Sequence, residues 1–213
     1  MVTLRCAAVL FDVDGTLVDS TPLIERAARA WALEYGIDAD EFLADAHGRP
    51  TSDRVAEFLP PDQVRAATAR LDALEATGTE GITALPGALD LLTSMNGLPW
   101  AMVTSMDRAQ FTVRTDVAGV PIPPVVVTAE DVPRGKPDPY GYRLAAEKLG
   151  VDPSTCVVIE DAPAGIKAGR AAGATVIAVT TSHAPSALTE AHHIIPNLTH
   201  AKATPEALHL TDL

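Results

Sequence analysis

The sequence has few of the residues that mark secreted or membrane-bound proteins. It contains only two cysteines, Cys6 and Cys156, and no Cys-x-x-Cys pair. This excludes a disulfide scaffold and indicates a reduced, cytoplasmic protein in which both thiols have a buried structural role. No apolar run approaches the roughly 18 residues that a membrane span needs. The N-terminus carries no signal-peptide pattern, so we expect no membrane partner.

Basic residues are also scarce. Lys and Arg number 16 against 28 Asp and Glu, which gives a net charge of 16 − 28 = −12. Such a chain repels a phosphate backbone, so we expect no nucleic-acid partner. If the ligand is an anion, a metal ion or a few well-placed cations must offset this field. The 213 residues are 47% apolar and 21% charged, which is typical of a folded protein with a real core and one or two domains.

Buried strands and helices alternate along much of the chain. Continuous apolar runs predict strands at Ala7–Asp12, Trp100–Thr104, Pro124–Thr128, Thr155–Ile159, Thr175–Val179 and, more weakly, His192–Ile195. Helical patterns separate most of them, at Pro86–Met95, Arg108–Val117, Pro139–Leu149 and Pro163–Ala172. This alternation predicts an α/β fold with a Rossmann-like parallel sheet. The last dozen residues are predicted to be a polar tail of no clear type.

The first strand is separated from the next by a long, mostly helical stretch. Its pattern predicts helices at Pro22–Tyr35, Ala39–Ala46, Ser52–Phe58 and Pro61–Ala76, followed by a hinge-like segment over residues 77–83. We interpret residues 17–84 as an inserted all-helical cap domain between two core segments, residues 1–16 and 85–213. The cap would cover the carboxyl ends of the strands, where open α/β sheets bind their ligands.

Three glycines four residues apart, Gly165, Gly169 and Gly173, fall on or just after one of these predicted helices. Their spacing gives the helix a smooth face, which predicts close packing on the sheet rather than a phosphate-binding loop. Gly173 is placed to end that helix.

Chemically reactive side chains gather at four of the predicted strand ends. The first group is Asp12-Val13-Asp14-Gly15-Thr16, whose two carboxylates can point into one pocket while the glycine allows a sharp turn. The others are Thr104-Ser105, Lys136 in a proline-stiffened loop, and Glu160-Asp161. Together they can hold a divalent cation such as Mg²⁺ and a phosphoryl group. One aspartate can attack phosphorus and its neighbour can transfer protons.

In this order the four groups resemble the motifs of the haloacid dehalogenase (HAD) superfamily of phosphotransferases. The matches are Asp12-Val13-Asp14-Gly15-Thr16 to D-x-D-G-T, Ser105 to the strand-end hydroxyl, Gly135-Lys136-Pro137 to the lysine motif and Glu160–Gly165 to E-D-x-x-x-G. The resemblance implies that Asp12 is the nucleophile and Asp14 the general acid/base. It also implies Mg²⁺ on the Asp12 carboxylate, the Asp14 backbone carbonyl and Asp161, with Glu160 in support.

The same resemblance implies the substrate and its contacts. The residues expected to bind it are Gly15, Thr16, Thr104, Ser105, Lys136 and, in the expected specificity loop of the cap, Arg49. Stretches such as residues 135–142 (GKPDPYGY) and 157–165 (VVIEDAPAG) are most similar to sugar-phosphate and glycerol-phosphate phosphatases. We therefore expect a monomeric, Mg²⁺-dependent phosphatase that hydrolyses small sugar or polyol phosphates through an aspartyl-phosphate intermediate.

Two alternatives remain. Phosphomutases similar to β-phosphoglucomutase share all four motifs, but they carry a cap histidine where this chain has Ile24 and a cap arginine near the position of Thr51. A phospho-acceptor signalling module would also combine acids, a hydroxyl and a lysine around Mg²⁺, but without a long helical insert. Asp14 argues against C–halogen cleavage, and the absence of lysine from residues 17–84 argues against phosphonate cleavage through a Schiff base.

Overall fold

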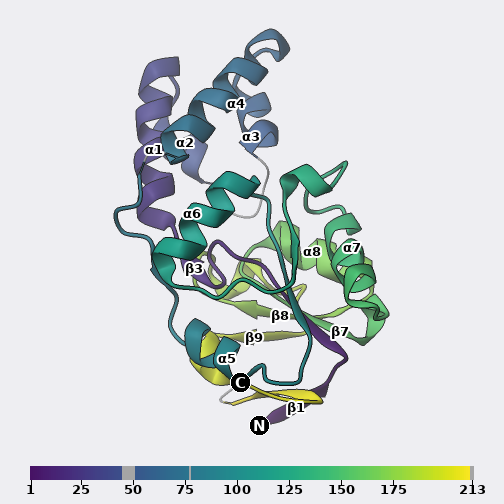
Figure 1. Cartoon of the computed structure of the whole chain (residues 1–213). Coiled ribbons are helices and arrows are strands. Elements are labelled where there is room, and N and C mark those ends of the chain that lie inside the picture. Colours follow the sequence, from purple (N-terminus) through teal and green to yellow (C-terminus); the bar gives the residue numbers. More distant parts are fainter. Residues whose placement is uncertain (45–50, 77, 212–213) are drawn as a thin grey trace.

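The computed structural model describes residues 1–44, 51–76 and 78–211, and a six-stranded sheet lies at its centre (Figure 1). The strand order is β6-β5-β2-β7-β8-β9. The strands are β2 (Ala8–Phe11), β5 (Trp100–Val103), β6 (Val125–Val127), β7 (Cys156–Glu160), β8 (Thr175–Val179) and β9 (His193–Ile195). All neighbouring pairs are parallel, which confirms the predicted sheet.

Helices cover both faces of this sheet, so its strands are buried on both sides. In β2, Val9 and Phe11 pack into one apolar cluster and Ala8 and Leu10 into the other, as the two-residue period of a strand requires. The covering helices are α5 (Ala88–Ser94) and α6 (Arg108–Ala118) on the first side and α7 (Tyr140–Leu149) and α8 (Pro163–Ala172) on the second (Figure 1).

Four further helices stand above the carboxyl edge of the sheet and have an apolar core of their own (Figure 1). We call them the insert helices: α1 (Thr21–Tyr35), α2 (Ala39–Leu43), α3 (Thr51–Phe58) and α4 (Pro61–Ala76). Trp31 is fully buried at their centre, stacks on Tyr35 and Phe42, and donates its indole N–H to the Ala67 carbonyl at 2.8 Å. These contacts join α1, α2 and α4 to one another without the sheet.

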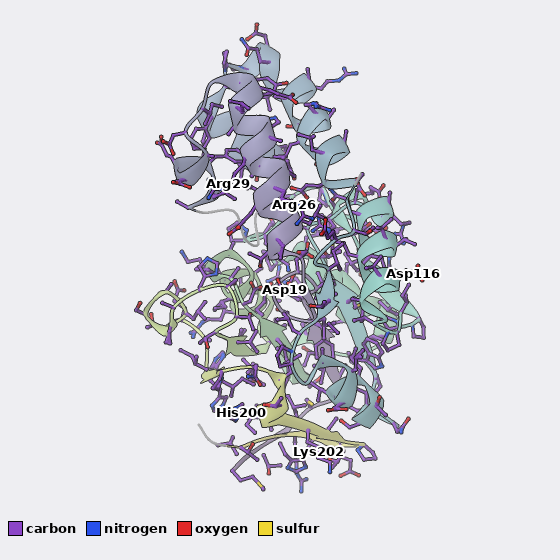
Figure 2. All side chains as sticks on the ribbon, turned by 90° about the vertical axis from the view of Figure 1, so that its left-hand side faces the viewer. Asp19, Arg26, Arg29, Asp116, His200 and Lys202 are labelled. Carbon is purple, nitrogen blue, oxygen red and sulfur yellow. The ribbon has the colours of Figure 1, made fainter. Side chains whose placement is uncertain are left out.

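The chain enters and leaves the insert helices through a short antiparallel pair, β3 (Val18–Asp19) and β4 (Thr83–Ala84). Arg26 on α1 fastens the return segment by donating to the Glu80 carbonyl at 2.6 Å. Figure 2 shows Asp19 and Arg26 near this junction. The cap boundaries at residues 17 and 84 stay a prediction, and the β3–β4 pair lies beside both.

The prediction of a polar C-terminal tail is wrong. β10 (Ala201–Thr204) and β11 (Ala207–Leu210) form a hairpin that pairs with β1 (Val2–Arg5), and this three-stranded antiparallel sheet lies below the main one (Figure 1). Leu208 and Leu210 are fully buried in the core. In a strand with one solvent-exposed face, polar and apolar residues alternate, so the segment has no continuous apolar run by which a strand could be predicted.

Short 3₁₀ helices complete the elements: η1 (Ala129–Asp131), η2 (Pro153–Thr155), η3 (Pro185–Ala187) and η4 (Leu198–His200). Among the described residues, none of the helices combines the length and apolarity needed to cross a bilayer.

Candidate active site

Three of the residues singled out from the sequence meet at the carboxyl edge of the sheet. Asp12 directly follows β2, Glu160 ends β7, and Lys136 reaches both from its loop. The Lys136 ammonium donates to Asp12 Oδ1, to Glu160 Oε1 at 2.7 Å and to the Val103 carbonyl at 3.1 Å. These side chains are all at least 93% buried. The three donors of the lysine are therefore all used inside the site.

Glu160 is held as tightly as the lysine. Its Oε1 also accepts from the Tyr142 hydroxyl at 2.7 Å, and its Oε2 accepts from the backbone N–H groups of Asp161 and Ala162 at 3.1 and 3.3 Å. A Cβ at Gly165 would lie 1.7 Å from Glu160 Oε1, so only glycine leaves room for this carboxylate. Glu160 thus acts as the anchor that fixes the lysine.

Asp161 lies against Gly15 and Thr16 of the first motif, residues 12–16. Ser182 donates to its Oδ2, and Thr16 donates to its Oδ1 at 3.4 Å. Gly15 has a φ of +81°, and a Cβ there would lie 2.1 Å from Asp161 Oδ2. The sharp turn and the close approach of Asp161 therefore both require glycine at this position.

Carboxylate oxygens crowd together at this edge. Within the described ranges, Asp12, Glu160 and Asp161 each place one ligand atom within 4.8 Å of the others. Burial raises the pKa of Asp12 well above its usual range, against the opposing effect of Lys136. Burial and the neighbouring Glu160 raise the pKa of Asp161 to about 7. Three buried acids against one lysine leave an excess of negative charge, and hard oxygen donors of this kind suit a divalent cation such as Mg²⁺.

The lysine stays charged in these surroundings. Burial acts to lower the pKa of Lys136, but the carboxylates of Asp12 and Glu160 outweigh it and raise that pKa above its ordinary value. A charged ammonium can attract a phosphoryl oxygen, which would share or replace one of the three acceptors that the lysine now contacts.

Asp14 makes a separate set of contacts. Its Oδ1 accepts from the Ser20 hydroxyl at 2.7 Å, and its Oδ2 accepts from Arg114 on α6. About a fifth of its side chain is exposed, so it is more accessible than Asp12. Both oxygens of this carboxylate are fixed by neighbours.

A cleft beside Lys136 gives the site room for a small molecule. Its volume is about 810 Å³, within the range of ligand pockets. Its lining includes Thr104, Ser105 and Lys136 from the sheet side and Ser52 and Asp53 from the start of α3. The cleft therefore lies between the sheet edge and the insert helices.

The two candidate hydroxyls differ in their surroundings. Thr104 is buried, and its Oγ1 accepts from the Met106 backbone N–H at 3.1 Å, whereas Ser105 is half-buried. Ser105 is therefore the more exposed of the two, and its role as a phosphate contact stays a prediction. Arg49, the predicted substrate residue of the specificity loop, lies outside the described residues.

Three contacts of the site escaped the sequence reasoning: those of Tyr142, Ser182 and Arg114. Tyr142 follows the lysine motif by six residues and shows no polar pattern of its own, and Ser182 lies in a loop after β8. Arg114 looks like a solvated helix residue until packing buries it to 2% exposure. Each depends on tertiary packing rather than on local spacing.

Comparison with known proteins agrees with this geometry. The haloacid dehalogenase-like hydrolase family matches residues 6–173. Hexitol phosphatase A of Escherichia coli is 46% identical over 200 residues, which cover 92% of this chain and 93% of that protein. 2-Deoxyglucose-6-phosphate phosphatase 1 of Saccharomyces cerevisiae is 35% identical over 204 residues, covering 85% and 83%. A solved hydrolase from Pseudomonas syringae superimposes with a TM-score of 0.83 at 25% identity, covering 90% and 94%.

Proposed function

The chain belongs to the haloacid dehalogenase-like hydrolases, and on that premise we propose that it hydrolyses small sugar or polyol phosphate monoesters. The observation that carries this proposal is the buried cluster of Asp12, Lys136, Glu160 and Asp161 at the sheet edge, beside a cleft of about 810 Å³. The relatives named for a hexitol and for 2-deoxyglucose 6-phosphate support a sugar or polyol as the alcohol part.

Asp12 is the proposed nucleophile. One of its carboxylate oxygens forms a bond to phosphorus while the bond from phosphorus to the substrate alcohol breaks, which leaves an aspartyl-phosphate. Asp14 gives its proton to the departing alkoxide, then takes a proton from the water that attacks phosphorus. The products are the alcohol and inorganic phosphate, and Asp12 is regenerated as a carboxylate.

Lys136 and Ser105 hold the phosphoryl oxygens in this proposal. Lys136 is charged and fixed by Glu160, so its position requires no rearrangement when negative charge spreads over the phosphoryl group. Ser105 lies in the lining of the same cleft.

Mg²⁺ is the proposed cofactor. The Asp12 and Asp161 carboxylates and the Asp14 backbone carbonyl would hold it, while Glu160, whose oxygens already accept from four donors, supports the lysine. When bound, the ion neutralises the clustered carboxylates and the phosphate charge. The donor set consists of the hard oxygens that this ion prefers.

The phosphomutase alternative is not favoured by the described residues. Ile24, at the position where the mutases carry a histidine, is an apolar residue buried in α1. Thr51, near the position of the mutase arginine, begins α3.

The test is release of inorganic phosphate from a panel of hexitol, sugar, glycerol, glycolate and nucleotide phosphates, with Mg²⁺ and with a chelator. We expect chelator-sensitive release from sugar or polyol phosphates, and a loss of at least about 1,000-fold in Asp12→Asn. Asp116→Asn, on the exposed side of α6, is the matched control and should retain full activity (Figure 2). Equal release by Asp12→Asn would contradict the proposal.

A further inference from the structure

Arg114 joins two carboxylates that belong to different parts of the molecule. It lies on α6, is 2% exposed, and donates through Nη2 to Glu75 Oε2 at 2.6 Å and through Nη1 to Asp14 Oδ2. Asp14 belongs to the loop after β2, whereas Glu75 lies in the last turn of α4, one of the insert helices. Figure 1 shows α6 between those helices and the sheet. One guanidinium thus links the first motif to the insert.

Arg114 and Glu75 are largely shielded from water, while Asp14 keeps some contact with it. Glu75 is 7% exposed, and the side chain of Asp14 is 19% exposed. Within the part of the chain that the structure describes, Arg114 Nε is buried and has no hydrogen-bond acceptor, so the two carboxylates hold the guanidinium. A buried ion pair becomes strongly unfavourable when one partner is removed. Both carboxylates therefore stabilise the present position of Arg114, and the loss of either one would leave part of a buried guanidinium without a partner.

Helix α6 approaches Glu75 with two side chains one helical turn apart. Gln110 donates through Nε2 to the same Glu75 Oε2, at 3.4 Å, and Arg114 follows four residues later on the same face. Asp14, in turn, is held by Ser20 on its other oxygen, at 2.7 Å. These contacts run without a break from the insert helix to the carboxylate beside the nucleophile.

We propose that Arg114 is a positioning residue that orients the Asp14 carboxylate, and that it does so only while Glu75 of the insert is docked against α6. The proposal rests on the proposed role of Asp14 as general acid/base. Its consequence is that the proton donor is aligned when the insert helices close over the cleft and loses that alignment when they swing away. Substrate enclosure and proton transfer are then coupled through one side chain.

The leaving group supplies the test, because a sugar alkoxide needs a proton when it departs and a nitrophenolate hardly does. For each variant, kcat/KM is measured with a hexitol phosphate and with 4-nitrophenyl phosphate. With either substrate, kcat/KM reports the steps up to and including phosphoryl transfer to Asp12. Asp14→Asn is the benchmark and should lower kcat/KM for the hexitol phosphate about 100-fold or more, and far less for the aryl phosphate.

Arg114→Lys keeps the charge but cannot bridge two carboxylates with a rigid fork. It should lower kcat/KM for the hexitol phosphate at least about tenfold and for the aryl phosphate less than about threefold. Glu75→Gln should show the same selectivity, and it carries the test if Arg114→Lys fails to fold. The double variant should be no worse than Arg114→Lys alone, because both changes break one chain of contacts.

The matched controls are Arg70→Lys and Glu34→Gln, which weaken an ion pair between α4 and α1 whose Arg70 and Glu34 side chains are 46% and 40% exposed. Both controls should leave the two substrates unchanged. Equal losses on the two substrates in Arg114→Lys and Glu75→Gln would indicate a merely structural role and overturn the proposal, as would no loss at all. If Asp14→Asn itself shows no preference between the substrates, the acid role of Asp14 is wrong, and the fault lies in the proposed function.

Discussion

The hydroxyl of Tyr142 allows the internal network of the site to be tested without any assumption about substrate. It donates to Glu160 Oε1 at 2.7 Å, and the two residues are 1% and 0% exposed. Burial and the nearby Glu160 raise the pKa of Tyr142 well above its usual range, so the phenol stays protonated and remains a donor. Tyr142→Phe removes this one hydrogen bond and almost no volume.

The loss of unfolding free energy expected for Tyr142→Phe follows from the charge of the acceptor, the Glu160 carboxylate. A hydrogen bond to a charged group contributes about 1.5–3 kcal/mol to stability. Because Lys136 still donates to the same oxygen at 2.7 Å, we expect the lower end, about 1.5–2 kcal/mol. In a chain of this size, that loss lowers Tm by about 3–8 °C.

The assay is urea unfolding followed by tryptophan fluorescence, with thermal unfolding in parallel. Tyr140→Phe is the matched control, since Tyr140 is 44% exposed and two residues away, and it should stay within about 0.5 kcal/mol of the parent. A Tyr142→Phe protein as stable as the Tyr140→Phe control would refute the reasoning, because Glu160 would then be satisfied without the phenol.

Further predictions concern the glycine, the metal site and the thiols. Gly165→Ala places a Cβ 1.7 Å from Glu160 Oε1 and should cost about 1–3 kcal/mol in urea unfolding; an unchanged midpoint would show that the carboxylate has room to move. Mg²⁺ at 100 times its Kd should raise the unfolding free energy by about 2.7 kcal/mol, and Asp161→Asn should remove that gain; a shift that survives in the variant would place the ion elsewhere. Burial raises the pKa of the Cys156 thiol to about 11, so iodoacetamide at pH 8 should label Cys6 well before Cys156, as read by peptide mass spectrometry. The folded state holds the Cys156 proton more tightly than the unfolded state, whose thiol has a pKa of 9.0. The free energy of unfolding should therefore fall as the pH rises from 9 to 11, and an unchanged free energy across that window would contradict the raised pKa.

The sheet and the strand-end residues were predictable because each leaves a local signal. A strand buried on both faces is a continuous apolar run, and the carboxyl ends of parallel strands meet at one edge. The meeting of Asp12 with Glu160, 148 residues apart, therefore follows from two separate strands and a rule of topology. The helices α4 and α8 also have their predicted bounds, since proline begins each of them and Gly173 follows α8.

What could not be predicted depends on packing between elements. Arg114 has the sequence surroundings of a surface residue, and only the placement of α4 against α6 brings Glu75 to it. The spacing of Gly165 and Gly169 predicts close packing on the sheet, and a Cβ at Gly169 would indeed meet Val158 and Val176 of β7 and β8. What the spacing could not show is that Gly165 makes room for the Glu160 carboxylate at the end of β7. The β10–β11 hairpin was missed because its polar residues alternate with the apolar ones that face the core.

The β3–β4 pair has a consequence for how such a chain can diversify. Because Val18 pairs with Ala84, the insert begins and ends at one point in space, and its length and sequence place no demand on the geometry of the sheet. Loop-closure entropy rises only slowly with loop length, so a longer or shorter insert would cost little. Evolution can therefore exchange the segment above the site as one unit while Asp12, Glu160 and Asp161 keep their positions at the sheet edge, provided that the new segment again supplies a partner for Arg114.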